Sequence, residues 1–432
     1  MPARELSHPV AFACTLDEVR NAIGERETRS FAAMLLENWV RLRVCLANCL
    51  LWLLHALLFK KGGLRSANFR HVVVYTAGIL GDNVVMLPAI AALRRRYPSA
   101  SITVVTNCQT GNPAAARGIF ADSPFVDRHL IVNDALVRRV GMRLRLDRGQ
   151  LSDVACELFV NLSPFGNRGW LGAVVRELAL AKMLKATHAL GFRVSTIMRS
   201  PRLRRVYPRM LKNEPRRAAE VLRPLGIEPL AWPEAMPIRS DARDSVRRKL
   251  AALGIEGRPL AVVHPGGKLR TQRWPAQQFG HLSDKLRERE GLTVVLTGAI
   301  EEQAIVDAAF AASAGGAVRL VGETTVAEMI ELLRIARLCV TNDTGAMHLA
   351  AAVGVPTVAI VGTRNTPAHW FPNSANVVAV FRLCECSYCY LENSGCEHLQ
   401  CLTGISVDDV GEAIQLALSR NAGNGETPSC RV

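Results

Sequence analysis

Short apolar runs rich in β-branched residues alternate with helical stretches over most of this chain, and this alternation constrains its fold more than any other feature. The runs at 71–76, 101–107 and 157–162 have the composition of buried strands, and an apolar-periodic helix at 83–97 separates the first two. A strand, a helix and a second strand at this spacing predict a parallel sheet. The pattern begins again near Pro259, where LAVVHPGG is followed by LTVVLTG, AVRLVG, RLCVTND and PTVAIVG.

The two series predict an α/β protein with two doubly wound domains, a number that suits a chain of 432 residues. We place the first domain at residues 71–237 and the second at 238–420, and we assign residues 1–70 to an N-terminal extension. In open parallel sheets, ligands bind beyond the carboxyl ends of the strands. Two such sheets that face each other would therefore form a cleft between the domains.

The extension contains the most apolar stretch of the chain, residues 44–59, which carries no formal charge. Basic residues flank it on both sides: Arg41, Arg43, Lys60, Lys61 and Arg65. A helix needs about 20 apolar residues to span a bilayer. Three interpretations stay open: the helix lies in the membrane interface, spans the bilayer, or packs against the protein's own core. The first thirty residues are polar and show no cleavable signal peptide.

An excess of basic residues indicates an anionic partner. The chain has 53 lysines and arginines against 38 acidic residues, a formal net charge of +15. Such an excess favours nucleic acid, an anionic membrane surface or a phosphorylated substrate. Aromatic residues make up only 6% of the chain, which disfavours a protein that stacks bases. We therefore expect no nucleic-acid partner.

The first predicted strand ends in TAGILGD, where Gly78 and Gly81 form a tight turn into a helix. Asp82 lies in or near the first turn of that helix. An aspartate there caps free backbone N–H groups and is favoured by the helix dipole. The alternative is a carboxylate held over a cleft as a general base. The spacing alone leaves both interpretations open.

A strand end in the second half carries Asp343, Thr344 and Gly345 at the start of a helix, with His348 one turn further. Free backbone N–H groups beside a hydroxyl form an anion site suited to a diphosphate. The turn HPGG supplies Gly266 and Gly267, whose missing side chains let a phosphate approach the backbone. Three cations follow this turn: Lys268, Arg270 and Arg273. The alternative for this segment is a solvated basic loop.

Glu301 and Glu302 follow a further strand end, in the sequence LTGAIEEQ. An acid at this point of a nucleotide-binding fold binds a ribose diol. The alternative is a cap on the next helix.

Together these motifs resemble the family 9 glycosyltransferases, the ADP-heptose:lipopolysaccharide heptosyltransferase family. GD-x-x-x-x-LP, HPGG…RWP, TGA-x-x-E and TNDTGAMHLAAAVGVPTVAIVG stand in the family's order over roughly residues 71–410. The resemblance implies the GT-B fold, with two Rossmann-like domains and the active site between them. It also implies inverting transfer of a heptose or related sugar from an ADP-sugar to a lipid-linked saccharide, in the assembly of lipopolysaccharide or a related glycan.

The resemblance also implies roles for single residues. Asp82 matches the family's proposed base, which takes the proton of the acceptor hydroxyl. Asp343 would hydrogen-bond the donor sugar, with His348 supporting its loop, and Glu302 would contact the ribose. The diphosphate would bind at Thr344, Gly345, Gly266, Gly267, Lys268, Arg270 and Arg273. We expect no catalytic metal, because helix N-termini and cations can stabilise the leaving diphosphate.

The sequence departs from the family pattern at Gln272, because many relatives carry a lysine two residues before the tryptophan of RWP. This departure bears on the donor preference. Two other functions remain as alternatives. The first alternative is a GT-B sugar-nucleotide 2-epimerase, and the second is a catalytically silent protein that binds saccharolipids.

Five cysteines cluster near the C-terminus, between Cys384 and Cys401. Four thiolates at close spacing suit a tetrahedral zinc or iron ion with a structural role. The set that we assign to this ion is Cys386, Cys389, Cys396 and Cys401. Disulfides and reduced thiols are the alternatives, and part of family 9 has a similar cysteine-rich tail.

Basic residues gather in the first domain, the acceptor side of a GT-B transferase. Eight cations lie close together: Arg199, Arg202, Arg204, Arg205, Arg209, Lys212, Arg216 and Arg217. We assign Arg204 and Arg205, with Gly78 and Gly81, to the acceptor side, and we expect the cluster to face a phosphorylated saccharolipid or an anionic inner-membrane surface. A solvated basic face is the alternative. We expect the protein on the cytoplasmic side of the inner membrane, peripheral or anchored by residues 44–59.

Overall fold

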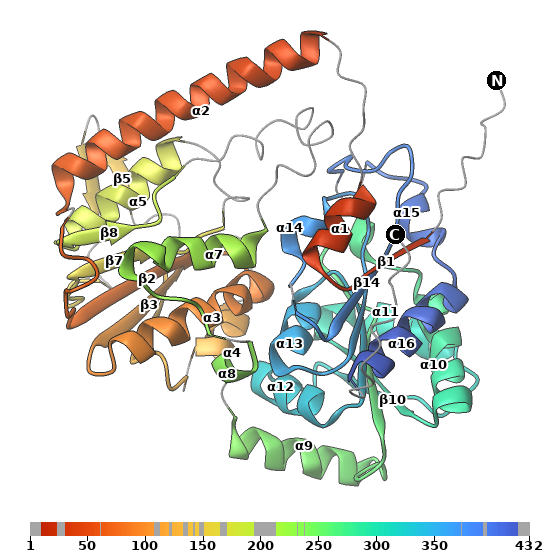
Figure 1. The fold of residues 1–432 in the computed structure, drawn as a ribbon. Helices are drawn as coiled ribbons and strands as arrows, with labels where there is room; N and C mark the ends of the chain where they lie inside the picture. Colours follow the sequence, from red (N-terminus) through yellow and green to blue (C-terminus); the bar gives the residue numbers. More distant parts are fainter. Residues whose placement is uncertain are drawn as a thin grey trace. The chain divides into compact units, whose positions relative to one another are not determined.

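The structure of the protein is a computed structural model, and it divides the chain into two compact units (Figure 1). Unit 1 comprises Met1–Glu25 and Ile238–Val432, and unit 2 comprises Arg26–Pro237. The structure describes residues 10–23, 31–60, 62–107, 113–120, 123–132, 137–140, 143–146, 151–164, 171–193, 213–230, 232–236, 238–372, 374–391 and 395–421.

Unit 2 is built on a five-stranded parallel sheet in the order β4-β3-β2-β7-β8. Its strands are β2 (His71–Ala77), β3 (Ser101–Asn107), β4 (Arg128–Val132), β7 (Leu158–Asn161) and β8 (His188–Leu190). The helices are α2 (Phe31–Leu58), α3 (Leu80–Arg96), α4 (Pro113–Phe120), α5 (Leu171–Met183), α7 (Glu214–Leu222) and α8 (Trp232–Ala235), with a 3-10 turn, η5 (Arg223–Leu225). A short hairpin pairs β5 (Val137–Val140) with β6 (Arg143–Leu146).

The strands of unit 2 form because both faces of the sheet are covered. Val72, Val73 and Val74 are consecutive residues of β2, so they point to opposite faces, and all three are fully buried. A parallel sheet covered on both faces carries such continuous runs of β-branched residues. This is the physical reason why the strands were recognisable in the sequence.

Unit 1 contains a seven-stranded sheet in the order β1-β14-β13-β12-β9-β10-β11. Its strands are β1 (Val10–Ala13), β9 (Leu260–His264), β10 (Thr293–Gly298), β11 (Val318–Val321), β12 (Leu338–Asn342), β13 (Thr357–Ile360) and β14 (Val377–Arg382). The helices are α1 (Leu16–Ile23), α9 (Ser240–Ala252), α10 (Ala276–Glu290), α11 (Gln303–Ala311), α12 (Val326–Ile335), α13 (Gly345–Val353), α14 (Pro367–Trp370), α15 (Gln400–Thr403) and α16 (Val407–Asn421). Two 3-10 turns, η6 (Arg270–Gln272) and η7 (Ile300–Glu302), follow β9 and β10.

The edge strand of this sheet comes from the far end of the chain. β1 pairs antiparallel with β14, and all other pairings in the sheet are parallel. Phe12 and Ala13 of β1 are buried in the packing of unit 1. Sequence analysis identified neither β1 nor β14, and it placed residues 10–13 in an extension outside the second domain.

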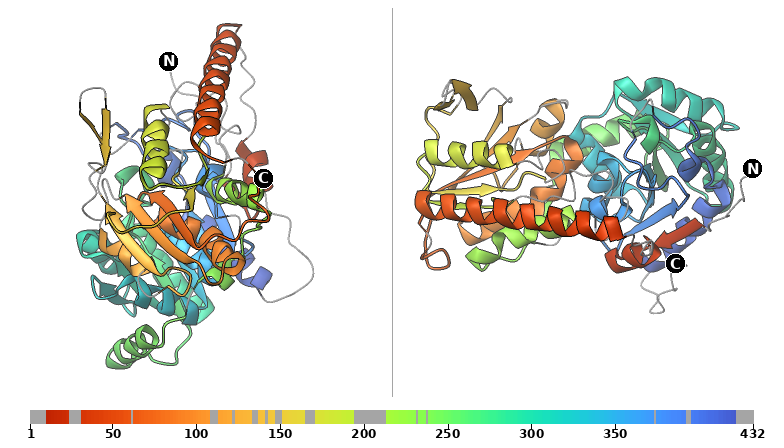
Figure 2. Two further views of the ribbon diagram at one scale, coloured as in Figure 1. Left: turned by 90° about the vertical axis from the view of Figure 1, so that its left-hand side faces the viewer. Right: turned by 90° about the horizontal axis from the view of Figure 1, so that it is seen from above.

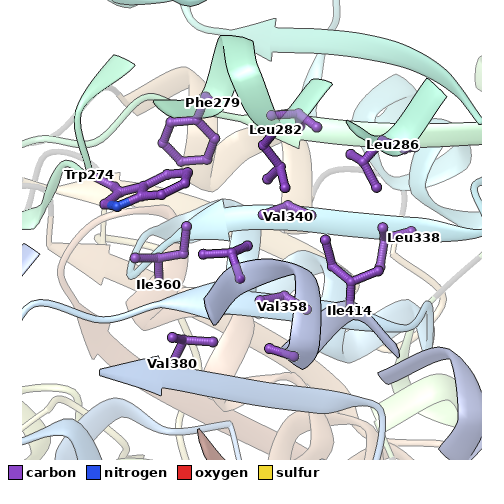
Figure 3. Packing of buried hydrophobic residues seen from close by; sticks show 14 of the residues in the cluster. Trp274, Phe279, Leu282, Leu286, Leu338, Val340, Val358, Ile360, Val380 and Ile414 are labelled. Carbon is purple, nitrogen blue, oxygen red and sulfur yellow. The ribbon is translucent and has the colours of Figure 1, made fainter. Parts of the chain in front are cut away.

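The core of unit 1 packs helices against the central strands (Figure 3). Phe279, Leu282 and Leu286 of α10 recur at helical spacing and are buried against β12 and β13. Trp274 is 1% exposed, and its indole Nε1 donates a hydrogen bond to the carbonyl oxygen of Ile405 at 2.9 Å. The motif RWP therefore fixes the segment after β9 to the body of the unit.

Both parallel sheets have Rossmann-like topology, which confirms the predicted α/β class. The first strand of each parallel series, β2 or β9, lies inside its sheet, and the later strands are added first on one side and then on the other. β1 joins the unit 1 sheet separately, at its edge. The order reverses between β2 and β7 in unit 2 and between β9 and β12 in unit 1. Ligands bind at the carboxyl ends of strands at such a switch point. The predicted motifs Gly81-Asp82 and Asp343-Thr344-Gly345 follow β2 and β12.

Helix α2 contains the predicted apolar stretch and lies beside α5 (Figures 1 and 2). Leu51 is buried, and Phe59 just beyond the helix joins the core of unit 2. The ring of His55 hydrogen-bonds through Nε2 to the carbonyl oxygen of Ala189 at 2.7 Å. Among the described helices, none has the length and apolar character to cross a membrane.

Candidate active site

Asn342, the last residue of β12, joins two turns at the switch point of unit 1. Its Nδ2 donates to the carbonyl oxygens of Pro265 and Gly266, both at 2.9 Å. Its Oδ1 accepts a hydrogen bond from the backbone N–H of Trp274 at 2.9 Å. The side chain is fully buried, so all three contacts are shielded from water. Asn342 therefore fixes the glycine turn after β9 next to Asp343.

Glu302 supports the same turn from the neighbouring strand. Its Oε1 accepts from the N–H of Gly267 at 2.6 Å, and its Oε2 accepts from the N–H of Ala299 at 2.9 Å. Oε2 also lies 3.5 Å from Nε2 of His264. A Cβ at Gly266 would stand 2.3 Å from the Glu302 carboxylate, so a side chain there would displace the carboxylate from the N–H groups it binds. The role of Glu302 as a ribose contact stays a prediction.

Burial makes the carboxyl of Asp343 a weaker acid than that of an exposed aspartate. Burial raises its pKa to about 6, and the positive charge of Arg364 opposes this shift. The backbone N–H of Asp343 donates to the carbonyl oxygen of Ile360 at 3.1 Å. Its carbonyl oxygen accepts from Nε2 of Gln272 at 3.4 Å, so the residue that departs from the family pattern touches this loop.

Thr344 and Gly345 form the start of α13. Thr344 has extended backbone angles, and the helix begins at Gly345. The first N–H groups of a helix have no acceptor within it, so they are available to an anion. The hydroxyls of Thr341 and Thr344 lie 3.3 Å apart. A Cβ at Gly267 would lie 3.3 Å from Cγ2 of Thr344, so the predicted phosphate-binding turns are neighbours.

His348 lies in the buried part of α13 and is 4% exposed. Burial lowers its pKa to about 4, so the ring is neutral at pH 7. The ring packs edge-on to Trp370, with centroids 6.2 Å apart. Its Nδ1 has no hydrogen-bond partner among the residues that the structure describes. The role of His348 as a support for the Asp343 loop stays a prediction.

The three cations after the glycine turn lie in different surroundings. Lys268 is exposed. Arg273 donates from Nε to the carbonyl oxygen of Gly267 at 2.6 Å, so it supports the turn itself. Arg270 donates to the carbonyl oxygens of Cys396 and Glu397 at 3.2 and 3.4 Å. Lys268 and Arg273 are therefore better placed than Arg270 to meet a phosphate on this turn.

In unit 2, Asp82 makes the capping contact that its spacing indicated. Its Oδ2 accepts a hydrogen bond from the N–H of Ile79 at 2.7 Å. Gly78 has φ +126°, and a Cβ there would stand 2.1 Å from the same oxygen. Asn83 also braces the turn, because its side chain contacts Thr76 Oγ1 at 3.1 Å and the Ile79 carbonyl at 2.9 Å. Gly81 is buried at the start of α3, and Asp82 stays half-buried.

The predicted acceptor residues Arg204 and Arg205 lie outside the described residues. Arg217, which sequence analysis grouped with them, has a structural role. Its Nε pairs with Oε2 of Glu214 at 2.6 Å, and it donates to the carbonyl oxygen of Leu162 at 2.7 Å. Both partners of the ion pair are buried, so Arg217 belongs to no solvated basic surface.

The four cysteines predicted to bind a metal do not form a ligand set. Within the described ranges, no group of three or more His, Cys, Asp or Glu side chains could hold a metal ion. The five cysteines of the cluster are reduced and not joined in disulfides. Cys384, which lay outside the predicted set, has its sulfur 3.5 Å from that of Cys386. Hydrogen bonds, first from Cys401 and then from Ser387, lower its pKa to about 5.

Sequence analysis missed the roles of Asn342 and Arg364. The only local signal for Asn342 was its place between a strand end and Asp343. Its partners at Pro265, Gly266 and Trp274 lie far away in the sequence, so spacing could not reveal them. Arg364 follows β13 and affects Asp343 through charge alone.

Comparisons with known proteins agree with this arrangement. The sequence profile of glycosyltransferase family 9 (heptosyltransferase) matches residues 177–399, just over half of the chain. Lipopolysaccharide heptosyltransferase 2 of Salmonella typhimurium is 27% identical over 309 residues, which are 67% of this chain and 82% of the relative.

Two solved structures share the fold of this chain. A family 9 glycosyltransferase from Veillonella parvula has a TM-score of 0.60 at 20% identity, over 82% of this chain and 98% of its own. The E. coli ADP-heptose lipopolysaccharide heptosyltransferase II has a TM-score of 0.55 at 19% identity, over 82% and 100%. These likenesses show that the two units have the GT-B fold. On the strength of the profile match, the chain belongs to glycosyltransferase family 9 and is a glycosyltransferase.

Proposed function

We propose that this glycosyltransferase transfers a heptose from ADP-heptose to a lipid-linked saccharide in lipopolysaccharide assembly, with inversion at the anomeric carbon. Membership of a heptosyltransferase family supports the sugar class. The names of the Salmonella relative and the E. coli structure support the acceptor class and the ADP-heptose donor. The observation that carries the proposal is the joining of the turns after β9, β10 and β12 at the switch point of unit 1.

The chemistry of these turns suits a nucleotide diphosphate sugar. The N–H groups at Thr344 and Gly345 can take the phosphate oxygens, and Lys268 and Arg273 supply positive charge. The Asp343 carboxylate repels phosphate, so we assign it to the hydroxyls of the sugar. Because N–H groups and cations meet the charge of the leaving diphosphate, we propose that the reaction needs no catalytic metal.

Asp82 is our proposed general base. The acceptor hydroxyl oxygen attacks the anomeric carbon, its proton passes to the Asp82 carboxylate, and the electrons of the broken carbon–oxygen bond leave with ADP. The cap uses one carboxylate oxygen on the N–H of Ile79. This contact orients the side chain at the switch point of unit 2, so capping and base catalysis are compatible.

We further propose that unit 2 binds the acceptor and that Arg204 and Arg205 contribute to this site. Phosphorylated saccharolipids are anionic, and arginines bind phosphate with paired hydrogen bonds. An acceptor linked to lipid requires the enzyme to work at a membrane surface. We assign it to the cytoplasmic side of the inner membrane, as a peripheral protein.

Calorimetric titration of donor-site variants tests whether Asp343 binds the sugar while the N–H groups at Thr344 and Gly345 bind the phosphates. We expect Asp343→Ala to weaken binding of ADP-heptose while leaving the affinity for ADP almost unchanged. Gly345→Val should weaken both, because its side chain crowds the phosphate away from the N–H groups. Equal losses for both ligands in Asp343→Ala would mean that Asp343 organises the loop and does not read the sugar.

Two substitutions at Asp82 separate the base from the cap. Asp82→Asn keeps an oxygen that can accept from the N–H of Ile79, but it removes the basic carboxylate. We expect it to lower kcat by about 10²–10⁴-fold with little change in stability. Asp82→Ala should lose activity and also about 1 kcal/mol of unfolding free energy. Full activity in Asp82→Asn would show that Asp82 is only a cap.

A further inference from the structure

Helix α2 carries an exposed apolar stripe along one face. The described residues include thirteen exposed large hydrophobic side chains, and eight of them belong to this helix. Seven recur at intervals of three or four residues: Leu35, Trp39, Leu42, Leu46, Leu50, Leu53 and Leu57. This spacing places all seven on one side of an α-helix. We call them the outer stripe.

The opposite face of α2 is attached to unit 2. Leu51 is 1% exposed and packs with Val174 of α5. His55 hydrogen-bonds to the carbonyl oxygen of Ala189, and Lys182 donates to that of Leu58 at 3.2 Å. In contrast, Leu46 is 61% exposed and Leu57 is 82% exposed. The outer stripe is therefore exposed although the helix is firmly attached to unit 2 through its inner face.

We propose that the outer stripe of α2 docks this protein onto an anionic lipid bilayer, with the helix lying in the plane of the interface. Its seven members lie within 23 residues, and the first and last are about 33 Å apart along a straight helix, which suits a flat surface better than a small pocket. Leucine and tryptophan are the side chains that such interfacial helices bury among headgroups and acyl chains. The inference goes beyond the proposed reaction, and it does not depend on which donor or acceptor is used.

The basic residues beside the outer stripe favour an anionic bilayer, and not a second protein, as the surface that covers it. Arg43 is exposed, and its guanidinium lies 4.6 Å from the ring centroid of Trp39, so a cation stands beside the outer stripe. Lys60 is exposed just beyond the end of the helix. The whole chain carries a formal charge of +15. Basic residues beside an apolar helix face are attracted to anionic lipid headgroups.

Attachment to unit 2 also determines how the helix meets the lipid. A spanning helix needs lipid or protein around its whole circumference, but the inner face of α2 already packs on α5. In-plane binding buries the outer stripe and leaves the contacts of His55 and Leu51 intact. The protein would then bind as a peripheral protein that an alkaline wash removes from the membrane.

Vesicle sedimentation of the full-length protein tests the proposal. We expect binding to vesicles of phosphatidylglycerol and phosphatidylethanolamine, and much weaker binding to pure phosphatidylcholine. The variant Leu46→Ser/Leu50→Ser/Leu53→Ser should reduce partitioning by about tenfold for each leucine replaced. The matched control, Ile238→Ser/Leu253→Ser/Ile335→Ser, replaces three exposed apolar residues elsewhere and should bind as the wild type does.

Tryptophan quenching gives a second readout that does not depend on a folding change. Trp39 lies in the outer stripe, whereas Trp274 is buried in unit 1. Lipids brominated on the acyl chain should quench the wild type. Trp39→Phe should reduce that quenching more than Trp52→Phe, because Trp52 is exposed on α2 but lies outside the outer stripe. Equal vesicle binding by the stripe variant and the wild type would overturn the proposal. So would a stripe variant that turns a dimer into a monomer while the wild type binds no vesicles, because the occupant would then be a second copy.

Discussion

Asp343 is the residue whose surroundings make the sharpest prediction. Burial raises its pKa to about 6, whereas an exposed aspartate titrates near 3.8. The folded state therefore holds a proton that the unfolded state releases between these two values. Stability from this group is complete below about pH 4 and is lost as the pH rises through about 6.

We therefore predict that Asp343→Asn stabilises the ligand-free protein above pH 6. The gain should be on the order of 1 kcal/mol, since Asp343 is only partly shielded from solvent, and it should vanish below about pH 4. Urea unfolding at pH 4.5 and pH 7.5 measures the difference. Asp244→Asn, at an exposed position of α9, controls for the loss of one carboxylate. A difference that does not change with pH would show that Asp343 titrates as an exposed acid does.

Contacts of single residues could be predicted from the sequence where both partners are close together in the chain. The capping contact of Asp82 spans three residues, so local spacing was enough to predict it. Glu302 contacts Gly267, which lies 35 residues away, and only the pairing of β9 with β10 brings them together. The cysteine set is a further case. Spacing allowed four ligands, but the described residues contain no group of three or more His, Cys, Asp or Glu side chains that could hold a metal ion.

In the turn after β9, the two adjacent glycines Gly266 and Gly267 differ in how much space a side chain would have. A Cβ at Gly266 would stand 2.3 Å from the Glu302 carboxylate, whereas the nearest atom to a Cβ at Gly267 is 3.3 Å away. We predict that Gly266→Ala lowers the free energy of unfolding by about 1–3 kcal/mol and that Gly267→Ala changes it much less. Chemical denaturation of both variants measures this. If Glu302→Ala failed to rescue part of the loss in Gly266→Ala, the clash would not be its cause.

The buried asparagine at the end of β12 holds this arrangement together. Asn342→Ala would leave two carbonyl oxygens and one N–H without partners in a buried site. Each unsatisfied group costs about 1–3 kcal/mol, so we predict one of the largest losses of any single substitution in unit 1. Equilibrium unfolding followed by circular dichroism and tryptophan fluorescence measures it. A loss below about 1 kcal/mol would mean that water replaces these contacts.

Sequence reasoning found the strands that are buried on both faces, because their β-branched runs are continuous. It missed β1, because the four residues VAFA form a strand only by pairing with β14, more than 360 residues away. It predicted the helix at residues 44–59, whereas α2 begins at Phe31 and is 28 residues long. The earlier part of α2 contains Glu37, Arg41 and other polar residues, and so it lacks the apolar signal.

For the whole molecule, two units with separate sheets and cores predict a local response to ligand. If ADP binds at unit 1, a concentration 100 times its Kd should stabilise that unit by about 2.7 kcal/mol. Amide hydrogen exchange should then slow in β9 and β12 more than in β2 and β3. Equal protection of both sheets would show either that ADP also contacts unit 2 or that the units unfold together.

We assign to this chain the transfer of a heptose from ADP-heptose. An assay of that reaction combines purified protein, ADP-heptose and a lipid-linked saccharide acceptor, and follows ADP release together with the mass of the acceptor. We predict that one ADP is released for each heptose gained by the acceptor, and that the activity survives a metal chelator but is lost in Asp82→Asn. No heptose transfer from ADP-heptose, with transfer from another nucleotide sugar to the same acceptor, would contradict it.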